Sequence, residues 1–396
     1  MVTNFHTMLC LFGAASTGNN IQIQPDINVD AVISCAAKQG VWQLVYAVIQ
    51  SLPEAQKFRL QFLTSVSEAL RRNEFTLEVI DKIQKSGIDI CLLKGVFASS
   101  MYANSDCRIS GDTDVLISEN DEKKVIEILK KAGYTIGERE KNDHHLKCKH
   151  PIGGLIEVHV SLYGEITDKI IFCGKLVYDE EYMEFEYGNR KIKTLGINDN
   201  LKYLTAHYIK HFLTGGSSIR QMMDLLLYMK HYQKYIDFDK YYELMKELKY
   251  DKLIEAVKTI GAKYFGMDFD ISEEKLADDI LNDCEAVGLF GSVKEKKSNV
   301  YEYFCSSRQN VSGIKLKLLF AFKSETTIFS RFFPSKRVLM KKGYKYAQNS
   351  FLIPIAWIHN LYNYILKKDI YKKEKYVDDE LTISRKTLMK KLDMID

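Results

Sequence analysis

The chain has 396 residues, of which 46% are hydrophobic and 27% are charged, and only five are proline. That length predicts two or three domains with cores of their own, and the hydrophobic content excludes a disordered chain. A formal net charge of +4 is too small to indicate nucleic-acid binding by itself. The eight cysteines are scattered without a Cys-x-x-Cys pair, which is typical of a reducing compartment, so we expect a cytoplasmic protein.

The first region expected along the chain, residues 1–85, is helical. Its opening stretch, MVTNFHTMLCLFGAAS, has no basic residue before the apolar run, so it fits the first turns of a helix better than a secretory signal. From residue 27 to residue 85, apolar residues recur at helical spacing. We therefore predict a helical N-terminal region.

The pattern changes to a period of two at GIDICLLKG, which predicts a buried strand ending at Gly95 and then a short helix, VFASSMYAN. A second strand, residues 112–117, precedes a helix that Asn120 would cap and Gly133 would end. HLKCKH and LIEVHVSL predict two further strands, and PIGG between them is a hairpin signal. Residues 86–197 are therefore predicted to form an α+β core.

Residues 198–300 return to helical spacing and predict a helical domain. Residues 301–396 form a basic and aromatic helical segment. Its stretch SFLIPIAWIHNLYNYIL is too short, and too interrupted by Pro354, to predict a membrane-spanning helix. Peripheral membrane contact, a protein partner and an anionic acceptor such as RNA are alternatives for this segment, beside a terminal helix packed on the body.

Two acids in the second strand carry the functional hypothesis. Side chains two apart on a strand point to the same face, so Asp112 and Asp114 lie together, and Glu157 and His159 do so on the later strand. If these strands are neighbours, three carboxylates converge. Such a cluster is unfavourable without a cation, and Mg²⁺ with substrate phosphates is the usual solution. The pattern predicts phosphoryl or nucleotidyl transfer; a solvated Asp pair at the end of an edge strand is the alternative.

The turn after the first strand fits this hypothesis. Gly95 lets a ligand approach the backbone closely, and a helix that begins there presents free N–H groups to an anion. Lys94 and Arg108 add positive charge suited to a triphosphate.

The order of these motifs resembles the nucleotidyltransferase superfamily that includes DNA polymerase beta and the antibiotic nucleotidyltransferases. That superfamily has a Gly-containing turn after the first strand, an acid-x-acid pair on the second and a third acid on a later strand. More closely, the chain is similar to a bacterial family of uncharacterised nucleotidyltransferases, on the strength of LLKGVFASSMY, RISGDTDVLI, GY, HH and EVHVSL in that order. The resemblance implies a polymerase-beta-like mixed sheet flanked by helical regions.

The resemblance also implies an enzyme that transfers a nucleoside monophosphate from an NTP such as ATP to an acceptor hydroxyl, with release of pyrophosphate. Asp112, Asp114 and Glu157 would be the catalytic residues and would bind Mg²⁺, or Mn²⁺ as an alternative. The implied nucleotide-binding residues are Lys94, Gly95, Arg108, Gly111 and His159. The wider superfamily usually has Gly-Ser where this chain has Lys94-Gly95. A nucleotide-binding or scaffold protein without turnover therefore remains an alternative, as does a toxin-like enzyme that modifies tRNA or protein.

The weaker candidates are His144, His145, His207, His211, Arg220 and Asp224. His144 shares a face with Cys148 and His150, which suggests zinc, but no second ligand cluster accompanies them, so we expect His144 or His145 to line the site instead. His207 and His211 lie four apart in HYIKH, which lacks the Glu of a zinc-protease helix; packing or a nucleotide contact is expected. Arg220 and Asp224 are also four apart and predict either a surface helix pair or a binding contact.

Overall fold

The computed structural model describes residues 3–24, 26–137, 145–164, 167–216, 218–288, 303–305, 307, 336–341, 343–349, 352–366 and 380–395. The chain forms two compact units, residues 1–301 with 387–396, and residues 302–386. The last ten residues belong to the first unit, and the expected division of residues 1–300 at residues 85 and 197 stays a prediction.

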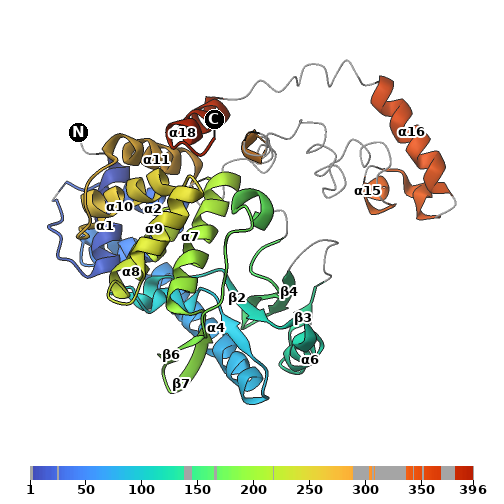
Figure 1. Ribbon diagram of the computed structural model, residues 1–396, viewed down its shortest axis with the longest axis horizontal. Coiled ribbons are helices and arrows are strands. Elements are labelled where there is room, and N and C mark those ends of the chain that lie inside the picture. The colour runs from blue at the N-terminus through green and yellow to red at the C-terminus, as the bar shows by residue number, and fades with distance from the viewer. Residues whose placement is uncertain are drawn as a thin grey trace. The chain divides into compact units, whose positions relative to one another are not determined.

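The N-terminal region is helical, as predicted, and contains α1 (Asn4–Thr17), α2 (Val29–Lys38), α3 (Trp42–Ile49), a 3₁₀ turn (Pro53–Phe58) and α4 (Arg59–Lys85). The long helix α4 contacts β1, β5 and β7, so it lies against the strands of the core (Figure 1). Its buried residues Leu77, Ile80 and Ile83 recur at helical spacing, which gives α4 one apolar face for this packing.

The core contains one five-stranded sheet in the order β1-β2-β5-β4-β3. Its strands are β1 (Ile90–Leu92), β2 (Asp112–Ile117), β3 (Thr135–Ile136), β4 (His145–His150) and β5 (Gly154–His159). β2 runs parallel to β5, whereas the other three neighbouring pairs are antiparallel. The fold is therefore the mixed-sheet α+β fold that the sequence predicts, and β2 and β5 are neighbours.

The helix after β2 begins differently from the prediction. A 3₁₀ turn (Glu119–Asp121) precedes α6 (Glu122–Lys131), and the Ser118 hydroxyl accepts a hydrogen bond from the Asn120 N–H at 3.3 Å. Ser118 thus caps this turn, and the prediction that Asn120 is the cap was wrong. Gly133 ends the element as predicted, with a φ of +92° that side chains other than glycine rarely adopt.

A second, two-stranded sheet consists of β6 (Met183–Tyr187) and β7 (Arg190–Thr194), and β7 packs beside β1. The sequence analysis did not predict this hairpin, although MEFEYGNRKIKT contains the alternating pattern and a Gly-Asn turn. Between β5 and β6 the described residues include one π-helical turn (Thr167–Ile171).

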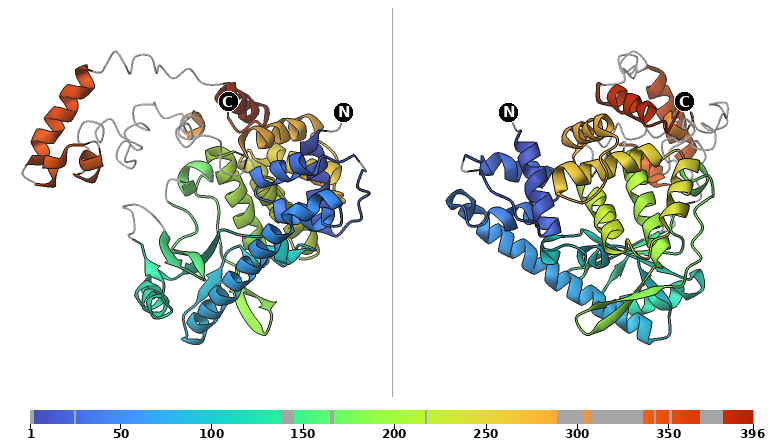
Figure 2. Two further views of the ribbon diagram at one scale, coloured as in Figure 1. Left: turned by 180° about the vertical axis from the view of Figure 1, so that it is seen from behind. Right: turned by 60° about the vertical axis from the view of Figure 1, so that its left-hand side comes forward.

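The predicted helical domain contains α7 (Ile197–Thr214), α8 (Ile219–His231), α9 (Phe238–Glu247), α10 (Asp251–Phe265) and α11 (Glu274–Val287). It shares a core with the N-terminal region, since α10 packs against α1 and the rings of Phe12 and Phe265 meet edge to face at 5.5 Å. Gly13 permits this close approach, because a Cβ there would lie 2.6 Å from Phe265 Cα. The views in Figure 2 show these helices gathered on one side of the sheet.

The second unit includes α15 (Lys336–Lys341), a 3₁₀ turn (Lys345–Gln348) and α16 (Ile353–Leu366), and α16 lies within the aromatic stretch noted in the sequence. Leu339 and Ala356 are buried against each other and surrounded by Tyr344, Ile353 and Trp357. The last helix, α18 (Glu380–Lys391), ends in the first unit. In the part of the chain that the structure describes, no helix has both the length and the hydropathy needed to cross a membrane.

Candidate active site

Three carboxylates converge on one face of the sheet. The parallel register places Asp114 of β2 opposite Glu157 of β5, and Asp112 lies two residues earlier on the same face. One carboxylate oxygen from each of these three residues lies within 4.8 Å of those of the other two. Asp114 is buried, whereas Asp112 and Glu157 are half-buried, so a ligand can approach the cluster from one side. Repulsion among three such groups must be balanced by nearby cations.

Asp114 is balanced by two neighbours. Lys94 Nζ lies 2.9 Å from Asp114 Oδ2, and His159 Nε2 lies 2.9 Å from Asp114 Oδ1. Burial opposes ionisation of Asp114, but Lys94 and His159 outweigh it and hold the pKa of this carboxyl well below its usual range. For Lys94, burial by itself would lower the pKa of the ammonium, yet the carboxylates of Asp114 and Asp112 raise it. Both groups of the ion pair are therefore charged at neutral pH.

Glu157 has the opposite electrostatic character. Burial, followed by the negative charges of Asp114 and Asp112, raises the pKa of its carboxyl above the usual value. Its two oxygens have different neighbours: Oε1 lies 3.7 Å from Lys147 Nζ, and Oε2 lies 3.7 Å from His145 Nε2. Within one cluster, then, Asp114 is a permanent anion and Glu157 is the carboxylate that binds a proton more readily.

The donors of this cluster fit a hard divalent cation. Carboxylate oxygens are the ligands that Mg²⁺ prefers, and Mg²⁺ sites in phosphate-handling proteins use one or two carboxylates together with substrate oxygens. Asp112, Asp114 and Glu157 supply such a set from two adjacent strands. The partial exposure of Asp112 leaves room for phosphate oxygens beside it.

The turn after β1 brings Lys94 to this cluster. The Leu93 N–H donates to the Asp114 carbonyl at 3.0 Å, which holds the end of β1 against β2. Gly95 has a φ of +76° and opens α5 (Val96–Ser99), which is only four residues long. Gly111, directly before β2, is exposed, and nothing lies within 4 Å of the place where its Cβ would be. The backbone at Gly111 is thus accessible to a ligand, whereas Gly95 is buried and its role is the positive φ of the turn.

Arg108 does not face the ligand side as the sequence analysis expected. It is buried, with 4% of its surface exposed, and donates from Nε and Nη2 to Asp224 at 2.8 and 2.5 Å. Its Nη1 donates to the Gly95 carbonyl at 3.1 Å, and the Tyr102 hydroxyl donates to Asp224 Oδ1 at 2.7 Å. Each of its three nitrogens already donates to a protein acceptor, so Arg108 holds the turn at Gly95, and none of these contacts supports the expected contact with a triphosphate.

The surface helix pair expected for Arg220 and Asp224 was also wrong. Asp224 is buried and binds Arg108, whereas Arg220 Nη1 donates to the Ile109 carbonyl at 2.9 Å. Helix α8 therefore holds two consecutive residues, Arg108 and Ile109, of the loop before β2. A signal existed in the sequence: the acid interrupts the apolar stretch MMDLLLYM, and an acid at a buried helix position requires a buried partner.

Helix α7 also reaches the cluster. Two donors, Lys94 Nζ at 3.4 Å and Gln221 Nε2 at 3.1 Å, approach His207 Nε2, which therefore accepts. Burial, and then the charge of Lys94, lowers the pKa of His207 well below its usual value, so the ring is neutral. The His211 ring lies 4.5 Å from that of His207. Gln221 is not among the predicted site residues, because a single glutamine on a helix gives no signal in the sequence.

The remaining histidines divide between two structural settings. His145 and His159 lie at the cluster, whereas His144 lies outside the described residues. His150 Nδ1 accepts from the N–H groups of Ile152 and Gly153, and its ring stacks on Phe75, so it stabilises the turn between β4 and β5. Among the described residues, the groups of converging metal ligands include neither His150 nor Cys148, and the zinc alternative gains no support.

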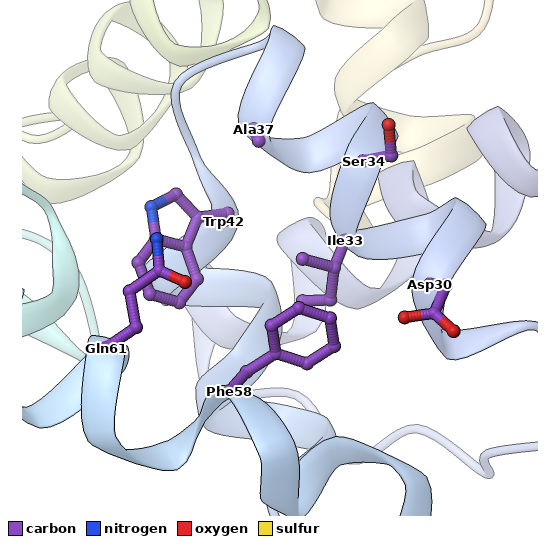
Figure 3. A pocket seen from close by; sticks show the side chains of 7 residues that line it. All are labelled: Asp30, Ile33, Ser34, Ala37, Trp42, Phe58 and Gln61. Carbon is purple, nitrogen blue, oxygen red and sulfur yellow. The ribbon is translucent and has the colours of Figure 1, made fainter.

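A separate apolar cavity of about 340 Å³ lies among α2, α3 and the start of α4 (Figure 3). Ile33, Trp42 and Phe58 contribute its apolar walls, and Asp30 lies at its edge. The Asp30 carboxylate is paired with Lys57 at 2.6 Å. The cavity contains none of the converging carboxylates, so it is not part of the candidate active site.

A model of one protein family, described as an uncharacterised nucleotidyltransferase, matches residues 25–266. The match extends from the N-terminal helices through the sheet to α10 and contains every element that supplies a side chain to the cluster. Searches of curated proteins and of solved structures gave no significant match.

Proposed function

We propose that this chain, which belongs to the family of uncharacterised nucleotidyltransferases, transfers a nucleoside monophosphate from an NTP to an acceptor hydroxyl and releases pyrophosphate. One observation carries the proposal: Asp112, Asp114 and Glu157 converge, with one oxygen of each within 4.8 Å of the others, beside the half-buried Lys94. Nucleotidyl transfer needs cations that neutralise the triphosphate and a group that accepts the proton of the acceptor, and this cluster offers ligands for such cations and a carboxylate that can accept a proton.

The three carboxylates would bind Mg²⁺, with Mn²⁺ as the alternative. A bound divalent cation would neutralise phosphate charge and stabilise the negative charge that develops on the leaving pyrophosphate. Asp112 and Asp114 are the stronger ligands of the set, because the neighbours of Asp114 keep it ionised and Asp112 is half-exposed.

Lys94 and the cation would compete for Asp114, and a Lys94 side chain displaced from Asp114 could bind phosphate. Its ammonium lies 2.9 Å from Asp114 Oδ2, an oxygen that a divalent cation would also need. Two cations on one carboxylate repel each other, so cation binding favours movement of the ammonium away from Asp114. The flexible four-carbon stem of lysine allows such movement, and the ammonium is a good partner for phosphate oxygens.

Glu157 is the general base in this proposal. The acceptor oxygen attacks the α-phosphorus and the bond from that phosphorus to the bridging β-oxygen breaks. Pyrophosphate leaves with the bonding electrons, and the acceptor proton passes to the Glu157 carboxylate. The pKa of this carboxyl is raised above its usual value by burial and by the two neighbouring acids, and a more basic carboxylate accepts a proton more readily than an ordinary glutamate. Arg108 and Asp224 contribute by positioning, because they hold the turn that carries Lys94.

A second candidate, nucleotide binding without turnover, is favoured by the same ion pair. The superfamily usually has Ser where this chain has Gly95 and Gly where it has Lys94, and Lys94 supplies Asp114 with an internal cation. Mg²⁺-dependent release of pyrophosphate from an NTP distinguishes the two candidates, because a protein that only binds the nucleotide releases none.

The acceptor is proposed only as a class: a small molecule, a protein or an RNA. The basic second unit is the part of the chain that supports an anionic acceptor or an anionic membrane surface, since Lys336 and Lys345 are exposed there. The double variant Lys336→Glu/Lys345→Glu should weaken binding of such an acceptor and leave NTP affinity unchanged. Equal binding of tRNA and of anionic vesicles by the variant and the wild type would remove this role.

The test of the main proposal is calorimetric titration of each NTP with Mg²⁺ into the wild type and Asp112→Asn/Asp114→Asn. We expect the double variant to lose metal-dependent NTP binding. The matched control is Asp106→Asn, which changes an exposed acid of the loop before β2 and should bind as the wild type does. Equal NTP affinity in the wild type and in Asp112→Asn/Asp114→Asn would show that the two aspartates have no role in nucleotide binding.

A further inference from the structure

Two histidines and Glu157 form a second group of converging ligands beside the carboxylate cluster. Strands β4 and β5 are antiparallel neighbours, and their register places His145 directly opposite His159. The two rings stack with centroids 5.1 Å apart and planes inclined by 30°. Glu157 is two residues before His159 on the same face, so all three side chains share one side of the sheet.

The two histidine nitrogens of this group lie near the same carboxylate oxygen of Glu157. Glu157 Oε2 lies 3.7 Å from His145 Nε2 and 3.9 Å from His159 Nε2, and one ligand atom from each residue lies within 4.8 Å of the others. Ligands bound at about 2.0–2.2 Å around a tetrahedral ion lie roughly 3.4 Å apart. The two observed oxygen–nitrogen separations exceed this value by only a few tenths of an ångström, which small side-chain movements can close.

We propose that His145, Glu157 and His159 form a second cation position, which takes a divalent transition-metal ion such as Zn²⁺ or Mn²⁺. Two imidazoles and one carboxylate leave a fourth position open, a ligand set typical of catalytic transition-metal sites, whereas Mg²⁺ prefers oxygen donors alone. The oxygen-only cluster of Asp112, Asp114 and Glu157 is thus the Mg²⁺ position, and Glu157 belongs to both groups.

The two positions are coupled through His159. Its Nε2 lies 2.9 Å from Asp114 Oδ1, so an ion bound by this nitrogen replaces the contact with Asp114. Lys147 provides the comparison for His145, because it lies on the same strand and the same face. Its Nζ also lies 3.7 Å from a Glu157 oxygen, Oε1, but a charged ammonium cannot act as a metal ligand. This second cation position rests on the proposed function only because both sites use Glu157. It specifies which metal ions each of the two sites binds.

The test is a titration of Co²⁺ into the full-length protein without nucleotide, followed by the visible absorption of the bound ion, which reports its coordination. The variants are His145→Gln, Lys147→Gln and Asp112→Asn. The first two introduce the same side chain at the two neighbours of Glu157 on β4, so they differ in the loss of a ligand and not in the residue introduced. Chemical unfolding of each variant checks that it is folded.

We expect the wild type to give the absorption of a four-coordinate ion and His145→Gln to weaken Co²⁺ binding by at least about 10-fold, since loss even of an outer-shell partner has such an effect. Lys147→Gln should bind Co²⁺ as tightly as the wild type or more tightly, and Asp112→Asn should retain the Co²⁺ spectrum. Equal Co²⁺ affinity in His145→Gln and Lys147→Gln would overturn the inference, as would loss of the spectrum in Asp112→Asn alone. Because no nucleotide is present, neither result depends on whether the protein transfers a nucleotide.

Discussion

The substitution Lys94→Met tests the electrostatic account of the site most directly. It keeps an unbranched side chain and removes the ammonium that lies 2.9 Å from buried Asp114. Removing one partner of a buried ion pair typically costs about 3–5 kcal/mol. We expect the lower end of this range, a fall of about 3 kcal/mol in the free energy of unfolding, because Asp114 keeps its contact with His159.

The same substitution should have opposite effects on the two ligands. Without Lys94, no ammonium competes for Asp114 Oδ2, so Mg²⁺ in the absence of NTP should bind roughly 10- to 100-fold more tightly than to the wild type. A 10-fold change corresponds to about half, and a 100-fold change to nearly all, of the expected loss of about 3 kcal/mol. NTP should bind more weakly in the presence of saturating Mg²⁺, because a phosphate partner has been removed. Mg²⁺ should also raise the unfolding temperature of the variant more than that of the wild type.

The assays are chemical unfolding and Mg²⁺ titration of the wild type, Lys94→Met and Lys147→Met. Lys147 is the matched control, because its ammonium also lies near the cluster but its side chain is 53% exposed. Its removal should change the free energy of unfolding by no more than about 1 kcal/mol. Equal Mg²⁺ affinity in the wild type and Lys94→Met would refute the proposed competition for Asp114.

Three further predictions concern pH and packing. The pKa of the Asp114 carboxyl is lower in the folded protein than in the unfolded chain, so Asp114 stabilises the fold above the unfolded pKa, and this contribution is lost as the pH falls below about 4. The free energy of unfolding should therefore fall less steeply with decreasing pH in Asp114→Asn than in the wild type. The pKa of Glu157 is raised, so pyrophosphate release should decline on the acid side at a higher pH than an ordinary glutamate would give, and Glu157→Gln should be inactive at every pH tested. Gly13→Ala would place a Cβ 2.6 Å from Phe265 Cα and should lower the free energy of unfolding by about 1–3 kcal/mol, whereas Gly111→Ala, which meets nothing within 4 Å, should be as stable as the wild type.

Local pattern was sufficient for much of the core. The period of two in DTDVLI and LIEVHV predicted that Asp112 joins Asp114 and that Glu157 joins His159 on one face, and both pairings are observed at the cluster. The helical spacing of residues 198–300 was equally clear, and α7 to α11 lie there. Such patterns are readable because alternation and helical spacing depend on residues a few positions apart.

The roles of Arg108 and Asp224 could not be predicted in the same way. The rule for helix neighbours suggested that Asp224 pairs with Arg220, four residues away, but its partner is Arg108, which lies 116 residues earlier in the chain. A local rule gives only a few tenths of a kcal/mol to an exposed helix pair, whereas a buried acid requires a strong partner wherever the fold brings one. The burial of α8 decided between these two outcomes.

The sequence alone determined the kinds of groups available and the faces on which they lie: acids two apart on strands, a lysine before a glycine turn and a histidine beside the third acid. Only the tertiary structure decided that β2 and β5 pair in parallel with Asp114 opposite Glu157, and that α7 brings His207 to Lys94 across 113 residues of sequence. The physical reason is that the charge balance of a buried cluster depends on distances of 3–4 Å between segments remote in the chain, and these distances result from packing of the whole core.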